Sequence, residues 1–549
     1  MDKIIYSMNL SDYKNQWVFD KINQCYSLLN MVYCQKPLAP ELQCMNIFVP
    51  KAYLTDYGDV ITDGTAGKYT ALTAPVVFEN GVGGYSESAP GVVDSKKGQG
   101  LNLLRLGMIY VNCGCRGKQT QLAGGTFIGK SPMGLVDLKA GIRFLKHNKG
   151  IIPGDMNRII SVGVSAGGAM SSLLGSTGNS GSYEKYLLEA GGIMEETDDI
   201  FASQCYCPII DLDHADIAYE WMFQKAESFS GMFGSGGGEL TLFQKALSKK
   251  LTEKYISYFN ELKLVNPVNL EILQLGDDGR SGSGYVFLMK VLEKAATKHL
   301  ELLKENKLYI NCSLEDYIHG NYTFLSDKPQ PGHAPSGPIA HGSTTAHDGL
   351  IAHNGSMAPG GPLHREPIEV KGLDKSEWLK WDGIKAGILN LDEMEKSYVS
   401  RMKDCTSFDD FNKCQAENQE FGSVVEDVLH FDTYIYPVLE ELKEQFPEEY
   451  EKYEQEFNVV IENKELEMRK YLINPFRYIG TDEICDIAPF YRIRVGTMDA
   501  HTSFTMAMTL ALKLEATGKT KVDYAMVWDE DHGAADYKGE LGNWITSIC

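Results

Sequence analysis

The chain has 549 residues, of which 43% are hydrophobic and 23% are charged, and its formal net charge at pH 7 is −22. This length exceeds that of one compact core of ordinary size, so we expect a large domain that carries an insertion, or two domains. A strongly acidic chain lacks the basic face that nucleic acids and anionic membranes require, so neither is an expected partner.

The sequence predicts neither a signal peptide nor a membrane span. The N-terminal stretch MDKIIYSMNLSDYKNQWVFDKINQ has no continuous apolar region and no small-residue cleavage site. No run of about 18 apolar residues occurs elsewhere. The twelve cysteines have neither CxxC nor zinc-finger spacing. We therefore expect free, buried thiols and a cytoplasmic protein.

The first part of the chain, from about residue 45 to 210, alternates predicted strands with a predicted helix. Apolar side chains three and four residues apart predict a helix with one buried face over 134–150. Short β-branched, apolar runs predict strands at 46–50, 74–80, 107–114 and 158–164. This alternation is typical of a mainly parallel sheet that helices cover on both faces, so the expected fold class is α/β.

The same pattern returns at the C-terminus, where strands are predicted at 490–497 and 522–528 around a helix at 503–518. We therefore expect the sheet to resume there. Charged helical patterns occupy the middle of the chain, together with a Gly-, Pro-, Ser- and His-rich segment that predicts a long irregular loop over 326–367. The expected organisation is a core built from 1–214 and 486–549, interrupted by a mostly helical insertion over 215–485. Such an insertion is well placed to cover the strand ends, where α/β sites lie.

A candidate nucleophile follows the predicted strand at 158–164. Gly163-Val164-Ser165-Ala166-Gly167 has the form G-x-S-x-G between a strand and a predicted helix. A sharp turn there needs small neighbours, and it projects the serine hydroxyl above the sheet. The turn also directs the N–H of Ala166 at a developing oxyanion. The alternative is a turn of small residues that serves packing alone.

A serine hydroxyl needs a base, and the base needs an acid to orient it. Asp499 follows the predicted strand at 490–497, and His532 follows the strand at 522–528. One strand–helix–strand step separates them, so both side chains should emerge at one edge of the sheet. The chain order Ser, Asp, His is that of this kind of site. His532 considered alone would be interpreted as a surface histidine.

A second oxyanion donor is predicted in the loop after the strand at 74–80. This loop reads Asn80-Gly81-Val82-Gly83-Gly84-Tyr85, and glycines let a backbone N–H approach a substrate carbonyl closely. We predict Gly83 or Gly84 as the donor, with a flexible turn as the alternative.

Two other motifs are weaker. Residues 124–131, GGTFIGKS, match the P-loop pattern, but no strand ends directly before them and Pro132 disfavours a helical start at Ser131. Asp211 and His214, with Asp213 and Asp216, suggest a metal site. Their position after a predicted strand near the same sheet edge favours pocket lining or hydrogen-bonded support, so we predict Asp211 and His214 as substrate-binding and expect no metal.

Four segments together resemble the bacterial tannase-type esterases of the α/β-hydrolase fold, related to feruloyl esterases. They are GVSAGGAMSSLLGSTGNS, DLDHADIAYEW, NGVGGY and GTMDAHTS…DHGAADY, and the similarity extends over about 40–220 and 485–549. The resemblance implies a serine esterase without a cofactor, with a large lid between the sixth strand and the catalytic acid. It assigns the catalytic triad to Ser165, Asp499 and His532. The fungal branch places disulfide-bonded cysteines beside the serine and histidine, where this chain has Val164 and Gly533.

One position departs from the family pattern. Two residues after the catalytic aspartate, bacterial tannases carry a second aspartate that binds a galloyl hydroxyl, and this chain has His501. A neutral histidine offers one acceptor nitrogen, whereas a carboxylate accepts several phenolic O–H bonds. We expect His501 to contact the acyl group, with hydroxycinnamates such as ferulate, or other acyl groups, as alternatives to gallate.

The sequence thus predicts a serine carboxylic-ester hydrolase for a small-molecule ester with a phenolic or aromatic acyl group. A serine peptidase or an acyltransferase on the same fold is the first alternative, and a non-catalytic binding protein is the second. The oligomeric state and the alcohol part of the substrate are not set by the sequence.

Overall fold

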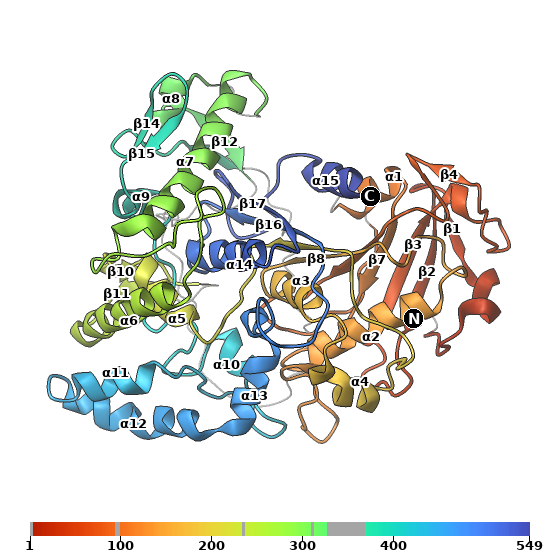
Figure 1. Ribbon diagram of the computed structural model, residues 1–549, viewed down its shortest axis with the longest axis horizontal. Helices are drawn as coiled ribbons and strands as arrows, with labels where there is room; N and C mark the ends of the chain where they lie inside the picture. Colours follow the sequence, from red (N-terminus) through yellow and green to blue (C-terminus); the bar gives the residue numbers. More distant parts are fainter. Residues whose placement is uncertain (1–3, 94–98, 233–235, 309–311, 327–367) are drawn as a thin grey trace, which may run out of the picture.

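A nine-stranded sheet runs through the centre of the computed structural model, which describes residues 4–93, 99–232, 236–308, 312–326 and 368–549 (Figure 1). The strand order across the sheet is β1-β2-β3-β7-β6-β8-β9-β16-β17. The strands are β1 (Val18–Asp20), β2 (Cys25–Val32), β3 (Cys44–Pro50), β6 (Val76–Asn80), β7 (Ile109–Cys113), β8 (Ile159–Val164), β9 (Ala202–Tyr206), β16 (Phe490–Gly496) and β17 (Lys521–Val527).

Neighbouring strands from β7 to β17 are all parallel, whereas β1, β2 and β3 form an antiparallel edge that joins β7. The predicted α/β class and mainly parallel sheet are confirmed, and every strand predicted from the sequence is present. The antiparallel pair β1 and β2 was not predicted.

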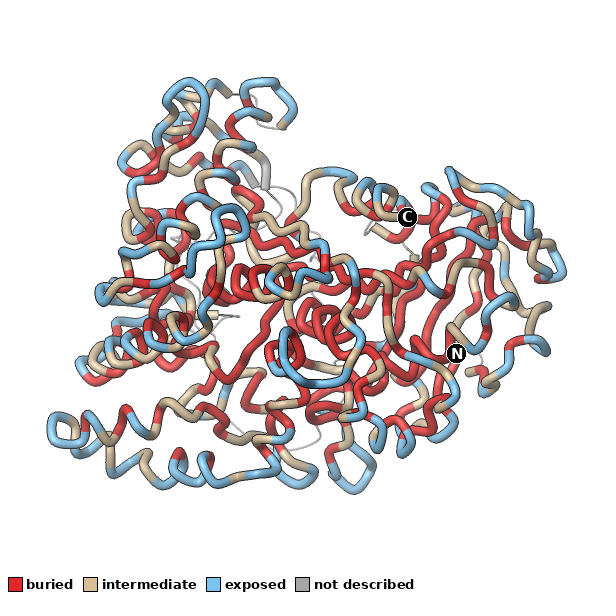
Figure 2. The backbone as a smooth tube through the Cα atoms, viewed as in Figure 1, coloured by how far each residue is buried: buried red, intermediate tan, exposed pale blue. Residues whose placement is uncertain are grey.

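Helices cover both faces of the sheet. The helices of this part are α1 (Gly100–Arg105), α2 (Met133–His147), α3 (Ala166–Ser176), α4 (Glu184–Ala190), α14 (Phe504–Ala516) and α15 (Glu540–Ile548). In Figure 1, α2, α3 and α4 lie on one side of the strands, and α1 and α15 lie on the other. Every residue of β3, β7 and β9 is buried, as expected for strands that are covered on both faces (Figure 2). The predicted helices at 134–150 and 503–518 are confirmed as α2 and α14.

The chain leaves the large sheet after β9 and returns at β16, which pairs in parallel with β9. The helices between these strands are α5 (Ala215–Met222), α6 (Leu242–Glu261), α7 (Gly282–Lys304), α8 (Leu314–Ile318), α9 (Leu391–Ser397), α10 (Ala416–Glu420), α11 (Ile435–Leu442), α12 (Pro447–Glu462) and α13 (Lys464–Leu472). The charged helical pattern of the sequence corresponds to α11, α12 and α13. The domain boundaries at 215 and 485 stay a prediction.

Short elements complete the structure. The two-stranded pairs are β4 (Thr65–Ala66) with β5 (Tyr69–Thr70), β10 (Ser228–Phe229) with β11 (Gly238–Glu239), β12 (Thr323–Ser326) with β13 (Ile368–Lys371), and β14 (Leu379–Trp381) with β15 (Ala386–Ile388). The 3₁₀ helices are Leu10–Gln16, Lys51–Tyr53, Gly181–Tyr183 and Pro475–Arg477. Residues 327–367, nearly all of the predicted irregular loop, lie outside the described residues.

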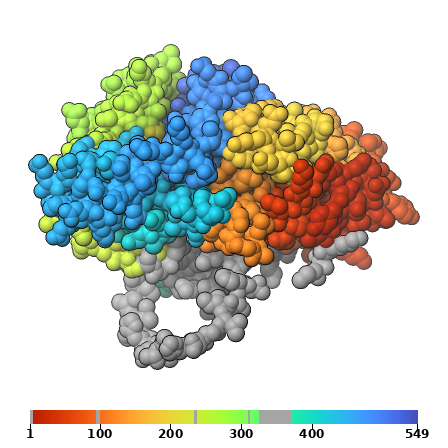
Figure 3. Space-filling model, turned by 90° about the horizontal axis from the view of Figure 1, so that it is seen from below, coloured from red at the N-terminus to blue at the C-terminus, as the bar shows by residue number. Residues whose placement is uncertain are grey.

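The insertion packs against the segment that resembles a P-loop. The Phe127 N–H donates to the Val424 carbonyl at 3.0 Å, and the Ser131 hydroxyl donates to the Arg469 carbonyl at 3.0 Å. Lys130 pairs with Asp427 at 2.9 Å. In Figure 3 the part of the insertion coloured cyan lies directly against the orange part of the core. The segment 124–131 therefore serves as a contact surface between the core and the insertion.

All twelve cysteines are free, as the sequence predicts, and eight of them are buried. Across the described ranges, no helix combines the length and the apolar character that crossing a bilayer would take.

Candidate active site

Ser165 occupies a sharp turn between β8 and α3. Its backbone has φ +62° and ψ −123°, a conformation that costs a non-glycine residue about 1–3 kcal/mol. A Cβ atom on Gly163 would lie 2.1 Å from the Gly167 carbonyl oxygen, and one on Gly167 would lie 2.6 Å from Oδ1 of Asn80. Only glycine fits at either position. The strand–turn–helix arrangement predicted around Ser165 is therefore present.

The neighbouring strand holds this turn in place. The Ser165 N–H donates to the Tyr206 carbonyl at 3.0 Å, and the Ser165 carbonyl accepts from the Ile209 N–H at 3.3 Å. Ala166 is the first residue of α3, so its N–H is one of those that a helix leaves without an intrahelical partner. The helix dipole adds a partial positive charge at the same place. The turn thus presents a half-buried hydroxyl next to a site that favours negative charge.

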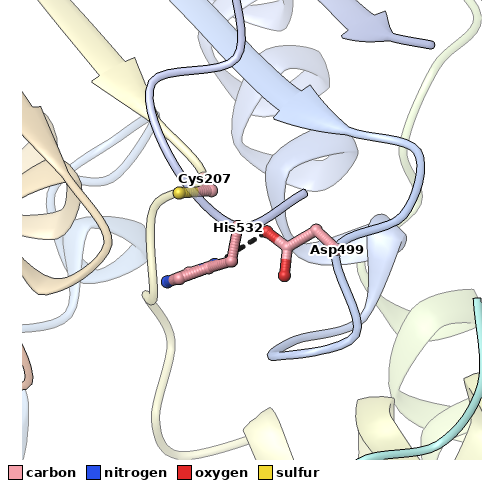
Figure 4. A group of neighbouring side chains, drawn as sticks. All are labelled: Cys207, Asp499 and His532. Atoms are coloured by element: carbon pink, nitrogen blue, oxygen red, sulfur yellow. Dashed lines mark hydrogen bonds and ion pairs between the residues drawn. The ribbon is translucent and has the colours of Figure 1, made fainter. Parts of the chain in front are cut away.

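Asp499 and His532 meet at the ends of β16 and β17. Nδ1 of His532 lies 2.9 Å from Oδ2 of Asp499, and Asp499 is fully buried while 14% of the His532 side chain is exposed (Figure 4). This hydrogen bond places a proton on Nδ1 and leaves Nε2 as the nitrogen that can accept one. Asp499 and His532, which were predicted to form an acid–base pair, are therefore joined by a hydrogen bond in which Nδ1 of His532 donates.

The surroundings stabilise the ion pair of these two side chains. Burial raises the pKa of Asp499, but the neighbouring His532 and His501 more than offset it, so the net pKa lies below its usual value. Burial lowers the pKa of His532, but the Asp499 carboxylate and the Cys207 sulfur raise it well above its usual value. A proton that reaches His532 is thus held strongly.

His501 lies against the ring of His532. The two rings stack with centroids 4.1 Å apart, and the His501 N–H donates to Oδ1 of Asp499 at 2.9 Å. Burial, followed by the charges of His532 and Lys403, lowers the pKa of His501 to about 3 although Asp499 opposes this. His501 is therefore neutral near pH 7. It lies beside the acid–base pair, which is where a side chain that contacts the acyl group is expected.

The predicted oxyanion loop lies at the N-terminus of α3. The Val82 carbonyl accepts from the Gly167 N–H at 2.9 Å, which fixes the loop beside the Ser165 turn. Gly84 has φ +51°, and a Cβ atom there would lie 3.6 Å from the Ala416 Cβ of α10. The loop is thus placed between α3 and the insertion. Which of Gly83 and Gly84 donates stays a prediction.

The insertion contributes two buried charges that the sequence analysis missed. Lys403 is 5% exposed and Glu417 is 7% exposed. Burial lowers the pKa of Lys403, opposed by the carboxylates of Glu417, Asp216 and Asp499, so the lysine lies within electrostatic reach of the acid–base pair. The charge of Lys403 also acts on His501. The segment around these residues has no periodic pattern, so nothing in the sequence singles it out.

Tyr219 of α5 connects this lysine to the acid loop. Its hydroxyl donates to the Ala500 carbonyl at 3.0 Å and accepts from the Lys403 N–H at 3.0 Å. The Lys403 ammonium lies 3.3 Å from the centre of the Phe408 ring. Tyr219 therefore fixes the position of Lys403 relative to the loop that carries Asp499.

Asp211 and His214 connect the core to the insertion through hydrogen bonds and ring stacking. Nδ1 of His214 lies 2.8 Å from Oδ1 of Asp211, which also accepts from Asn474 at 2.7 Å, and Oδ2 accepts from the Tyr258 hydroxyl at 2.6 Å. The His214 ring stacks on Tyr258 with centroids 3.7 Å apart. These contacts are those of structural support, and substrate binding by Asp211 and His214 stays a prediction.

No family model matches the sequence, and a search of curated proteins finds no match. Solved structures do match. A tannin acyl hydrolase from Lactobacillus plantarum is 29% identical with a TM-score of 0.73, over 96% of this chain and 94% of that chain. The tannase of Fusobacterium nucleatum is 26% identical with a TM-score of 0.74, over 99% and 100%. A tannin acyl hydrolase in complex with ethyl gallate is 28% identical with a TM-score of 0.71, over 96% and 94%. The α/β-hydrolase fold with a helical insertion, expected from the resemblance, is thus confirmed.

Proposed function

We propose that this chain, whose structural neighbours over nearly its full length are bacterial tannases, is a serine carboxylic-ester hydrolase that acts on esters of phenolic acids. The observation that carries the proposal is the hydrogen bond between His532 and Asp499, at the same edge of the sheet as the strained Ser165 turn. A packing turn would need neither this strain nor a buried acid–base pair.

The proposed reaction proceeds through an acyl-enzyme. The Ser165 hydroxyl attacks the ester carbonyl while Nε2 of His532 takes its proton, and Asp499 stabilises the imidazolium that forms. The N–H of Ala166 and that of Gly83 or Gly84 hold the oxyanion. His532 then protonates the leaving alcohol. Water, deprotonated by His532, attacks the acyl-enzyme and releases the acid and free Ser165.

The acyl group is proposed to be phenolic because polar groups converge beside the acid–base pair. Lys403 donates hydrogen bonds, Glu417 accepts them, and neutral His501 can do either. A ring whose hydroxyls both donate and accept fits such a set. One structural neighbour is described in complex with ethyl gallate, which supports a galloyl ester as the first candidate. His501 in place of a carboxylate keeps hydroxycinnamoyl esters such as ferulates as the second candidate.

The test is a comparison of kcat/KM for methyl gallate, methyl ferulate and a short aliphatic nitrophenyl ester, with Ser165→Ala as the blank. We expect the phenolic esters to lead and Ser165→Ala to lose turnover by a factor of about 10⁴ or more. Ser228→Ala, at an exposed position of the insertion, is the control that should keep full activity. Unchanged turnover in Ser165→Ala would refute the mechanism.

Two further measurements address the alternatives. Hydrolysis of the amide counterpart of the best ester would favour a peptidase, and transfer to an added alcohol at the expense of hydrolysis would favour an acyltransferase. A stoichiometric burst of acyl-enzyme with an activated ester separates an enzyme from a binding protein. The cytoplasmic location stays a prediction.

A further inference from the structure

A cysteine lies next to the acid–base pair and takes no part in the proposed reaction. Cys207 directly follows β9 and is fully buried. One ligand atom each of Cys207, Asp499 and His532 lie within 4.8 Å of one another, and the three side chains come together from different strand ends (Figure 4). In the described part of the chain, this is the one group of three or more His, Cys, Asp or Glu side chains close enough to hold a metal ion.

The backbone holds the sulfur in this position. The Cys207 N–H donates to the Arg494 carbonyl of β16 at 2.7 Å. The thiol donates to the Gly533 carbonyl, next to His532, at 3.4 Å. Cys207 has φ +35°, so its side chain leaves the chain at a turn that few non-glycine residues adopt. Cys207 is therefore held by β16 and by the loop that carries His532.

A thiolate and an imidazole are ligands that soft and borderline divalent cations prefer, and a carboxylate also binds zinc. Zinc binds sulfur at about 2.3 Å and nitrogen or oxygen at about 2.0–2.2 Å, so two ligands of a tetrahedral ion lie about 3.4–3.6 Å apart. The three ligand atoms lie within 4.8 Å of one another, so the side chains need to approach by up to about 1 Å to share one ion. Three protein ligands leave one position of a tetrahedral ion for water.

We propose that Cys207, His532 and Asp499 form an inhibitory binding site for one soft divalent cation such as Zn²⁺ or Cd²⁺. On binding, the Cys207 thiol and the coordinating ring nitrogen of His532 each release the proton that they carry to solvent, and the thiol gives up its hydrogen bond to Gly533. The ion forms bonds to the sulfur, to one ring nitrogen of His532 and to one oxygen of Asp499. No electron transfer is involved, and removal of the ion restores the hydrogen bonds.

The ion inhibits because it occupies the imidazole of His532, and this half of the inference rests on the proposed function. Whichever ring nitrogen binds the ion, His532 can no longer both donate to Asp499 and accept a proton from Ser165. Magnesium prefers oxygen ligands and should not compete for a site that contains a thiolate. The site therefore predicts inhibition by zinc and cadmium at concentrations at which magnesium has no effect.

The test measures Cd²⁺ binding to the purified full-length chain by equilibrium dialysis, together with the ultraviolet band of the cadmium–thiolate bond, in the absence of substrate. The variants are Cys207→Ser and Cys207→Ala, with Cys414→Ser as the matched control because Cys414 is the exposed cysteine. Since eleven other cysteines are present, the quantity that matters is the difference between each variant and the parent chain. Turnover is then measured with Zn²⁺, Cd²⁺ and Mg²⁺, and again after a chelator is added.

We expect both Cys207 variants to lose one tight Cd²⁺ equivalent, with affinity reduced by at least about tenfold, and Cys414→Ser to retain it. Ser165→Ala should still bind the ion, which separates this site from the proposed reaction. In the active chain, Cd²⁺ should abolish turnover reversibly, and Cys207→Ser should resist it. Equal Cd²⁺ binding by the parent chain and by both Cys207 variants would overturn the proposal, whether or not the chain hydrolyses esters.

Discussion

The rings of His501 and His532 stack with their planes at 21°, yet their surroundings act on their pKa values in opposite directions. The Asp499 carboxylate faces Nδ1 of His532, and it receives only the backbone N–H of His501. One carboxylate therefore favours the charged form of one ring, and that charge together with burial keeps the other ring neutral. The pair separates a proposed base from a proposed acyl contact although the two residues are of the same type.

Replacement of Asp499 by Asn should remove most of the activity while the fold is kept. The amide cannot stabilise an imidazolium and can turn His532 to the wrong tautomer, so kcat should fall by a factor of about 10⁴. Nuclear magnetic resonance of the histidine ring protons should show the pKa of His532 lowered relative to the parent chain. Activity within tenfold of the parent chain would contradict the assignment of Asp499.

His501 should make the protein less stable in acid. Its pKa is about 3 in the folded chain and about 6.5 when unfolded, so below pH 6.5 the unfolded chain binds the extra proton. Between those values, stability falls with falling pH by up to about 1.4 kcal/mol per pH unit from this group. His501→Gln lacks this proton uptake on unfolding. The free energy of unfolding of the variant, minus that of the parent chain, should therefore be more positive at pH 4.5 than at pH 7.5. Thermal unfolding followed by circular dichroism at both pH values measures this difference, and an equal difference at the two values would refute it.

The contribution of His532 to stability should change with pH in the opposite direction. Its folded pKa is raised above the unfolded value, so its contribution to stability is fully present below about pH 6.5 and is lost as the pH rises through the folded pKa. A comparison of His532→Gln with the parent chain at pH 6 and pH 9 tests this. The variant should be the less stable chain at pH 6, and its deficit should shrink at pH 9. A deficit that grows with pH would show that the imidazolium is not stabilised by Asp499.

Lys403 and Glu417 should distinguish phenolic from aliphatic substrates. If they bind ring hydroxyls, Lys403→Met and Glu417→Gln should reduce kcat/KM for the preferred phenolic ester by about 10–100-fold, the cost of one or two lost hydrogen bonds to charged groups. Turnover of a short aliphatic nitrophenyl ester should change far less. Lys413→Met, in the same segment but partly exposed, is the control. Equal losses on both substrate classes would assign these residues to structural support.

Gly163 should tolerate no side chain. In Gly163→Ala, the new Cβ atom would lie 2.1 Å from the Gly167 carbonyl oxygen, a backbone atom that cannot turn aside. We expect a loss of about 3 kcal/mol or more, or little soluble protein. Gly181→Ala is the matched control, since no atom lies within 4 Å of its new Cβ and its φ is not positive. Wild-type thermal stability of Gly163→Ala would show that the turn is looser than described.

The sequence by itself determined the α/β class, the parallel strands, and the positions of Ser165, Asp499 and His532 at strand ends. These features are local, because strand and helix patterns repeat every few residues and the three side chains directly follow such patterns. His501 was singled out by the resemblance to bacterial tannases, which carry a second aspartate two residues after the one that corresponds to Asp499. The catalytic roles of these residues remain proposals that the mutations above test.

Only the tertiary structure decided which distant residues surround that site. Lys403 lies in an irregular stretch of the insertion and Glu417 lies in the short helix α10. The burial of Lys403 near Asp499 depends on contacts such as those of Tyr219 with Lys403 and with Ala500. In the sequence, Cys207 is only one of twelve cysteines expected to be free and buried. Its position beside Asp499 and His532 follows from the placement of β9, β16 and β17 side by side. Such contacts join segments hundreds of residues apart and leave no periodic pattern. Long-range packing, and not local propensity, therefore sets the proposed substrate contacts and the proposed metal site.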